Sequence, residues 1–62
     1  MTIDEMIVKY SGNVVLDSEF DEIVLSEYVE HTENNGRSGI DPRLEWFTVY
    51  FIDGREMDVY YH

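Results

Sequence analysis

The hydrophobic residues near the N-terminus recur at helical spacing. Four apolar side chains fall on one helical face: Ile3, Met6, Ile7 and Tyr10. Thr2 and Glu5 have the spacing of a capping box, and Gly12 follows as a stop signal. The pattern predicts a short helix over residues 3–10. Its β-branched residues leave a strand through "EMIVKY" as the alternative.

The stretch "DSEFDEIVLSEYVEHTE", residues 17–33, sorts better at the period of a helix than at that of a strand. As a strand it would mix carboxylates and apolar side chains on the same face. As a helix it gives one apolar stripe and a carboxylate-rich opposite side. The stripe holds Phe20, Val24 and Tyr28 with His31 beside it, and the opposite side holds Glu19, Glu22, Glu30 and Glu33. We therefore predict a helix over 18–33.

Local signals at both ends of this segment agree with the helix. Ser18 is a good N-cap residue, and "ENNG" supplies Asn and Gly as a stop. The β-branched residues within 18–33 have modest helix propensity, so a strand stays as the alternative. Before this segment, residues 14–16 are expected to form a buried strand or a core connection. After it, "NNGRSGIDPR", residues 34–43, predicts a long mobile loop.

The C-terminal segment gives the clearest strand signal. "LEWFTVYFI" and "REMDVYYH" flank Asp53 and Gly54, which predicts a β-hairpin over 44–52 and 55–61 with a two-residue type I′ turn. In that register Trp46 faces Tyr61, and Tyr50 faces Met57 on the same side of the ribbon. Both sides of the first strand are apolar. Either the sheet is covered on both faces, or one aromatic face contacts a partner.

Together these elements predict an α+β fold in a single domain over residues 1–62, with one or two helices packed on an antiparallel sheet that includes the C-terminal hairpin. A chain of 62 residues without cysteine has a small core and no disulfide or thiolate zinc site to support it. Good packing, a partner or a homodimer is therefore required. The chain has 44% hydrophobic and 15% aromatic residues, too many for a disordered acidic tail.

The net charge of −10 limits the classes of partner. It repels nucleic-acid backbones and anionic membranes, so direct nucleic-acid binding and a membrane role are not expected. No apolar run approaches the ~20 residues needed to span a bilayer, and no secretion signal precedes the domain, so we expect a cytoplasmic protein. Seven carboxylates on a helix over residues 17–33 would give one charge per ~3.6 Å of axis, close to the ~3.4 Å per phosphate of a DNA strand.

No residue pattern indicates a reaction. Asp17, Glu19 and Asp21 imitate the start of a calcium loop, but the glycine and the last glutamate of such a loop are missing. His31 and His62 are isolated and lack metal-ligand spacing. The chain has no phosphate-binding glycine loop, serine elbow or nucleophilic cysteine. We predict no catalytic residue, no metal and no cofactor, and therefore no enzyme.

The predicted site is a surface for a protein partner. The acidic residues late in the predicted helix, Glu27, Glu30 and Glu33, lie where the helix dipole disfavours them, so a partner would explain them. Tryptophan and tyrosine are common interface anchors. The candidate partner-binding residues are Glu19, Glu22, Glu27, Glu30, Glu33, Trp46, Tyr50 and Tyr61.

These features favour a non-catalytic acidic inhibitor, a nucleic-acid mimic that binds the basic nucleic-acid site of a host protein. In size and charge the chain resembles small phage-encoded proteins that block host nucleases, restriction enzymes, DNA-repair glycosylases or CRISPR effectors. That resemblance implies anti-restriction or anti-CRISPR action in the host cytoplasm. The alternative is a small acidic structural or interaction module, salt-adapted and homodimeric through a face with Trp46 and Tyr61.

Overall fold

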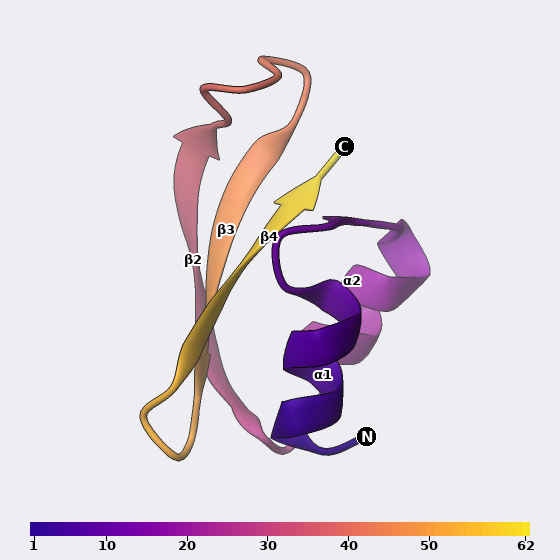
Figure 1. Cartoon of the computed structure of the whole chain (residues 1–62), viewed down its shortest axis with the longest axis vertical. Helices are drawn as coiled ribbons and strands as arrows, with labels where there is room; N and C mark the ends of the chain where they lie inside the picture. The colour runs from indigo at the N-terminus through magenta and orange to yellow at the C-terminus, as the bar shows by residue number, and fades with distance from the viewer.

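The computed structural model describes residues 1–62 and has two helices on one face of a four-stranded sheet (Figure 1). The elements in chain order are α1 (Ile3–Tyr10), β1 (Val14–Val15), α2 (Asp17–Val24), β2 (Val29–Arg37), β3 (Glu45–Phe51) and β4 (Glu56–Tyr61). The strand order across the sheet is β1-β4-β3-β2. The predicted α+β class and the C-terminal antiparallel hairpin are confirmed, and the parallel pairing of β1 with β4 makes the sheet mixed.

Helix α1 begins and ends as the sequence predicts. The Glu5 backbone N–H donates to Thr2 Oγ1 at 3.2 Å, and the Thr2 N–H donates to Glu5 Oε1 at 3.0 Å, which completes the capping box. Gly12 follows the helix with a φ of 75°, a conformation that glycine adopts without strain. The helix reading of 3–10 is therefore correct, and the strand alternative is wrong.

Helix α2 is much shorter than the predicted helix over 18–33. It starts one residue earlier and ends at Val24, and residues 29–33 belong to strand β2. Its N-cap is Leu16, whose N–H donates to Glu19 Oε1 at 3.0 Å, so Ser18 lies inside the helix and is not the cap. After the helix the Tyr28 N–H donates to Ser26 Oγ at 3.2 Å. This serine turn redirects the chain into the sheet.

Strand β2 lies at the edge of the sheet and runs through the segment expected to be a helix end and a loop. It pairs antiparallel with β3, from Val29 opposite Phe51 to Arg37 opposite Glu45. The register shifts between Val29 and His31 and again between Asn34 and Arg37. "ENNG" is therefore part of a strand, and the loop before β3 covers only residues 38–44. Residues 14–16 contain the short strand β1, in which Val15 is buried and Val14 is exposed.

The hairpin of β3 and β4 differs from the prediction by one residue in register. Phe47 pairs with Val59 and Val49 with Met57, whereas a two-residue turn would have paired Tyr50 with Met57. The Phe51 N–H donates to the Arg55 carbonyl at 2.8 Å, so the connecting loop has three residues, 52–54. Gly54 occupies its last position with a φ of 93°, as three-residue hairpin loops require.

The core lies between the two helices and one face of the sheet. Its buried hydrophobic residues come from every element except β2: Ile3, Met6, Tyr10, Val15, Ile23, Val49, Phe51, Met57 and Val59. Phe20 of α2 packs between the rings of Phe47 and Tyr61, with both ring centroids 4.8 Å away.

Arg55, just after the hairpin loop, contacts Asp4 of α1 and Asp53, with both N–O distances at 2.6 Å. The helices therefore cover one face of the sheet and leave the other without a covering layer.

Candidate partner-binding surface

The sheet face opposite the helices is the candidate site, and we name it the open face (Figure 1). Alternate residues of three neighbouring strands form it, because successive side chains of a strand point to opposite faces. Its members are His31, Glu33 and Asn35 from β2, Trp46, Thr48 and Tyr50 from β3, and Glu56, Asp58 and Tyr60 from β4. The set combines aromatic rings with carboxylates.

A polar ladder at the centre of the open face joins its three strands. The Asn35 amide donates to Thr48 Oγ1 at 2.7 Å, and the Thr48 hydroxyl donates to Asp58 Oδ1 at 3.2 Å. Thr48 is only 8% exposed because the neighbouring side chains cover it. The ladder fixes one oxygen of Asp58 and leaves Oδ2 without a hydrogen bond inside the chain.

Aromatic side chains lie at both ends of this ladder. Towards the hairpin loop, the His31 and Tyr50 rings stack with centroids 4.5 Å apart, and the Tyr50 hydroxyl donates to Glu33 Oε2 at 3.1 Å. Towards the other end Trp46 is opposite Tyr60, and Trp46 keeps 37% of its surface exposed. The open face therefore presents flat aromatic surface to solvent.

The three carboxylates of the open face lie close enough to raise the pKa of the same side chain, Tyr50. Glu33 raises the pKa of Tyr50 above its usual value, first through its hydrogen bond, and burial and the charges of Glu33, Glu56 and Asp58 raise it further. The neutral phenol is favoured because a tyrosinate would lose that hydrogen bond and meet three negative charges.

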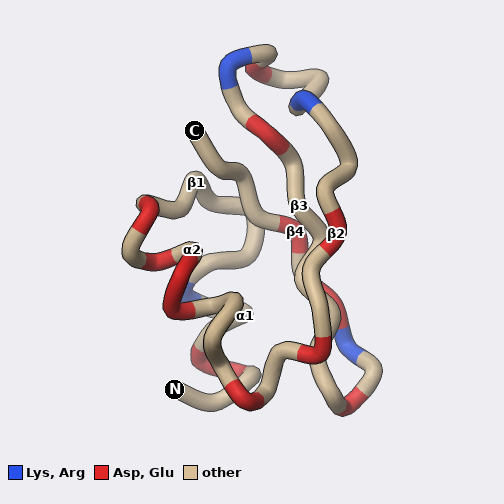
Figure 2. The backbone as a smooth tube through the Cα atoms, turned by 180° about the vertical axis from the view of Figure 1, so that it is seen from behind, with Lys and Arg blue, Asp and Glu red and all other residues tan.

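None of the four basic side chains lies on the open face. Arg43 binds Asp41, Arg55 binds Asp4 and Asp53, and Lys9 lies over the Tyr10 ring at 5.1 Å. Arg37 donates to the Pro42 carbonyl at 3.1 Å. In Figure 2 the acidic segments are spread along the whole tube, and the basic ones are few and lie mainly at the connecting loops. The three carboxylates of the open face therefore have no cation of this chain to neutralise them.

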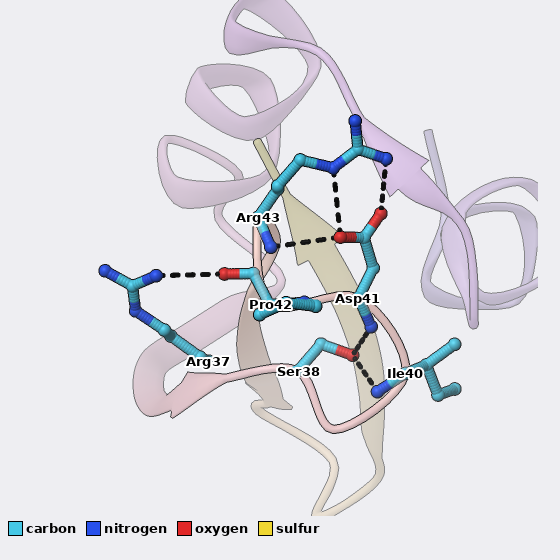
Figure 3. Close-up of polar contacts among 6 residues, drawn as sticks. All are labelled: Arg37, Ser38, Ile40, Asp41, Pro42 and Arg43. Atoms are coloured by element: carbon cyan, nitrogen blue, oxygen red, sulfur yellow. Dashed lines mark hydrogen bonds and ion pairs between the residues drawn. The ribbon is translucent and has the colours of Figure 1, made fainter.

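The loop over residues 38–44 is held by its own hydrogen bonds (Figure 3). Ser38 is buried, and its Oγ accepts the N–H groups of Ile40 and Asp41 at 3.1 and 3.5 Å. The Asp41 carboxylate accepts three donors of Arg43 at 3.0 to 3.1 Å, and this pairing lowers the pKa of Asp41. The loop borders an open hollow of about 210 Å³. Tyr60, Val14 and Leu44 line this hollow.

The structure brings together three of the eight predicted site residues: Glu33, Trp46 and Tyr50 share the open face. Glu30 lies at the register shift of β2, with its carboxylate 3.4 Å from His31 Nδ1. Glu27 is exposed in the turn before β2. The single-helix arrangement that was to align the glutamates is wrong, because α2 ends before all three of the late ones.

The other predicted site residues lie on the helix side of the sheet and have partners within the chain. Glu19 accepts the Leu16 N–H, and Glu22 Oε2 accepts the Tyr10 hydroxyl at 3.4 Å. Tyr61 packs against Phe20, and its hydroxyl donates to Asp17 Oδ1 at 2.6 Å. The expectation that Trp46 and Tyr61 share a face is therefore wrong, because the register shift of one residue separates them.

Sequence reasoning left out Glu56, Asp58 and Tyr60, which join Trp46 and Tyr50 on the open face. A signal for them was present. Met57, Val59 and Tyr61 alternate with these residues, and the apolar set of β4 must face the core together with Val49 and Phe51. The observed register satisfies that requirement, and a register shifted by one residue does not.

No three His, Cys, Asp or Glu side chains are grouped so that they could hold a metal ion. Neither helix has the length and apolar character needed to cross a membrane. No protein-family model, curated protein or solved structure matches the chain. The surface chemistry described above is therefore the basis for any functional proposal.

Proposed function

We propose that the chain is a non-catalytic inhibitor whose open face binds the basic nucleic-acid site of another protein in place of the nucleic acid. Its targets are host nucleases, repair enzymes, restriction enzymes or CRISPR effectors, and it acts in the host cytoplasm if a phage encodes it. One observation supports the proposal most directly: three carboxylates and three exposed or half-buried aromatic rings share a sheet face that holds none of the chain's lysines or arginines.

The charge argument now rests on the sheet instead of on a long acidic helix. Helix α2 has 8 residues, so the density calculated for a helix of seventeen residues does not apply. On β4, Glu56 and Asp58 are two residues apart on one face, which places their backbones about 6.8 Å apart. Glu33 lies two strands away, about 9.6 Å across the sheet. These spacings are wider than the ~3.4 Å of axis per phosphate along one DNA strand, so the open face would match only part of the charge that a basic nucleic-acid channel binds.

An isologous dimer through the open face is a weaker reading of the same surface. Two-fold symmetry would place the open face of one copy against that of the other, so the interface would contain Glu33, Glu56 and Asp58 of both copies and no lysine or arginine. Like charges brought together in this way oppose association. A dimer through Trp46 and Tyr61 would need both on one face, and they lie on opposite faces.

The test is displacement of labelled duplex DNA from a panel of enzymes, including a restriction endonuclease, a repair glycosylase and a guide-loaded CRISPR effector. The open-face variant carries Glu33→Gln, Glu56→Gln and Asp58→Asn. The matched control carries Asp21→Asn, Glu27→Gln and Glu45→Gln, which lie off the open face. Each variant loses three negative charges and has a net charge of −7. We expect the wild type and the control to displace DNA from at least one enzyme, more weakly at high salt, and the open-face variant to fail.

If both variants lose the ability to displace DNA to the same extent, the net charge of the chain and not the open face causes the displacement. If the wild type displaces DNA from no member of the panel, and nucleic-acid-binding proteins are not enriched among proteins that it captures from a lysate, the proposal is wrong.

A further inference from the structure

We propose that the open face selects arginine guanidinium groups over lysine ammonium groups. This inference rests on the proposed function, because it specifies the chemistry of the basic surface that the chain binds. The occupant is thus an arginine-rich surface of a partner protein. Charge complementarity carries the first step: a partner that covers this face must supply the cations that the chain does not place there.

The second step is the arrangement of rings and carboxylates. Tyr50 lies opposite Glu56, and Tyr60 is two residues from Asp58 on the same strand. Trp46 is diagonal to Asp58, because it pairs with Tyr60 while Thr48 pairs with Asp58. Side chains in opposite and diagonal positions lie about 5 to 8 Å apart. Trp46 and Tyr60, on which no ring of this chain stacks, therefore each have a carboxylate within the reach of a stacked group, and Tyr50 has one on the side of its ring away from His31.

The third step is the shape of the cation. A guanidinium group is planar, stacks on aromatic rings and donates in its own plane, so that one group can cover a ring and bind the carboxylate beside it. An ammonium group is a compact, strongly hydrated charge without a flat surface. Lysine can interact with either half of the ring-and-carboxylate arrangement, but arginine can stack on the ring and bind the carboxylate at once.

The fourth step is that two of the carboxylates are held in place. Tyr50 binds Glu33 through Oε2, and Thr48 binds Asp58 through Oδ1. Glu33 Oε1 and Asp58 Oδ2 accept no hydrogen bond within the chain. A fixed acceptor loses less conformational entropy on binding than a free side chain does. The rings are equally free of internal cations, since the only cation near an aromatic ring is Lys9 over Tyr10 on the helix side.

The probes are two peptides of equal charge, hexa-arginine and hexa-lysine. Trp46 is the only tryptophan in the chain, so its fluorescence reports binding at the open face directly. We expect hexa-arginine to bind about tenfold more tightly than hexa-lysine at the same ionic strength. Amide shifts in a heteronuclear NMR titration should be largest on β3 and β4, at residues 46–50 and 56–60.

Two variants separate stacking from charge. In Trp46→Leu, measured by calorimetry, the preference for arginine should fall from about tenfold to a few-fold, because Tyr50 and Tyr60 remain, and hexa-arginine binding should weaken more than hexa-lysine binding. Trp46→Phe keeps a ring and should retain part of the preference. Tyr60→Leu leaves the Trp46 reporter in place, so the same comparison is possible if the Trp46→Leu protein does not fold.

Equal binding of the two peptides by the wild type overturns the inference, and so does a titration whose largest shifts fall on α2 or on residues 27–30. These outcomes are separate from failure of the proposed function. If arginine is not preferred but DNA is displaced from an enzyme, the inhibitor proposal stands and the arginine inference falls. If arginine is preferred but no DNA is displaced, the arginine inference stands and its partner belongs to another class of protein.

Discussion

Two tyrosine hydroxyls donate to carboxylates on opposite faces of the sheet. Tyr50 donates to Glu33 on the open face at 3.1 Å, and Tyr61 donates to Asp17 on the helix side at 2.6 Å. In both cases the hydrogen bond is the largest cause of a pKa raised above 10.0. A raised pKa in the folded state stabilises the fold at pH values below the usual tyrosine pKa, and that contribution is lost as the pH rises through the raised value.

An alkaline titration followed by the NMR signals of the tyrosine rings measures these two pKa values. Glu33→Ala should return the pKa of Tyr50 towards 10.0 and leave Tyr61 raised, because only the acceptor of Tyr50 is removed. Asp17→Ala should have the reverse effect. A Glu33→Ala protein in which Tyr61 shifts as much as Tyr50 would contradict the separate pairings.

Thr48 is the one buried hydroxyl of the open face, and its removal tests the polar ladder. In Thr48→Val the size of the side chain is kept, but the Asn35 amide loses its acceptor and Asp58 loses its donor. We expect a loss of about 1–2 kcal/mol in the free energy of unfolding, measured by urea denaturation. Thr48→Ser keeps the hydroxyl and should lose less. A valine variant as stable as the wild type would show that the ladder does not stabilise the sheet.

The three-residue loop between β3 and β4 depends on the conformation of Gly54. Its φ of 93° is one that a residue with a Cβ rarely adopts, although no atom would obstruct the added carbon. Gly54→Ala should therefore lower the free energy of unfolding by about 1 kcal/mol through backbone strain alone. Gly39 also has open space around it but no positive φ, so Gly39→Ala is the matched control and should change stability by no more than about 0.5 kcal/mol.

The helix prediction was correct for α1 and wrong for residues 29–33, which form part of strand β2, and these two outcomes have different physical causes. The elements of α1 are local: a capping box, a regular apolar stripe and a glycine stop all lie within residues 2–12, so the sequence was sufficient. Strand β2 is not decided locally. The register shift after Val29 moves the core-facing side chains from odd to even positions, so that Thr32 follows Val29 on the helix side of the sheet. A β-bulge of this kind breaks the alternation by which a strand is recognised, and the helical period appeared to fit better.

The composition of the open face could be predicted only in part, for a related reason. Both sets of side chains on β3 are mainly apolar or aromatic, so that strand fits either face and does not fix the register by itself. The choice between a two-residue and a three-residue loop then decides which face β4 contributes to. Trp46 and Tyr50 were identified as anchors because of their residue types. Their neighbours Glu56, Asp58 and Tyr60 depended on pairing across strands, and the helical reading of residues 29–33 placed Glu33 with the wrong neighbours.

The whole molecule carries a net charge of −10 on a surface of 4120 Å², and its ion pairs involve few of the fourteen acidic residues. The remaining carboxylates repel one another in the compact state more than in the unfolded chain. Salt reduces this repulsion, since the screening length falls from about 30 Å at 0.01 M to about 3 Å at 1 M. The melting temperature should therefore rise with salt concentration.

A thermal unfolding series from 0.01 to 1 M NaCl, followed by circular dichroism, distinguishes the inhibitor from a salt-adapted module. An inhibitor that works in an ordinary cytoplasm should already be folded at 0.01 M and unfold cooperatively, with a rise of about 5 °C across the series. Both triple variants, at a net charge of −7, should rise less, because the repulsion that salt relieves is smaller. A salt-adapted module should instead be unfolded at the lowest concentration and fold only as salt is added. That result would favour the module, since a chain folded only at high salt would be unfolded where electrostatic attraction to a basic channel is strongest.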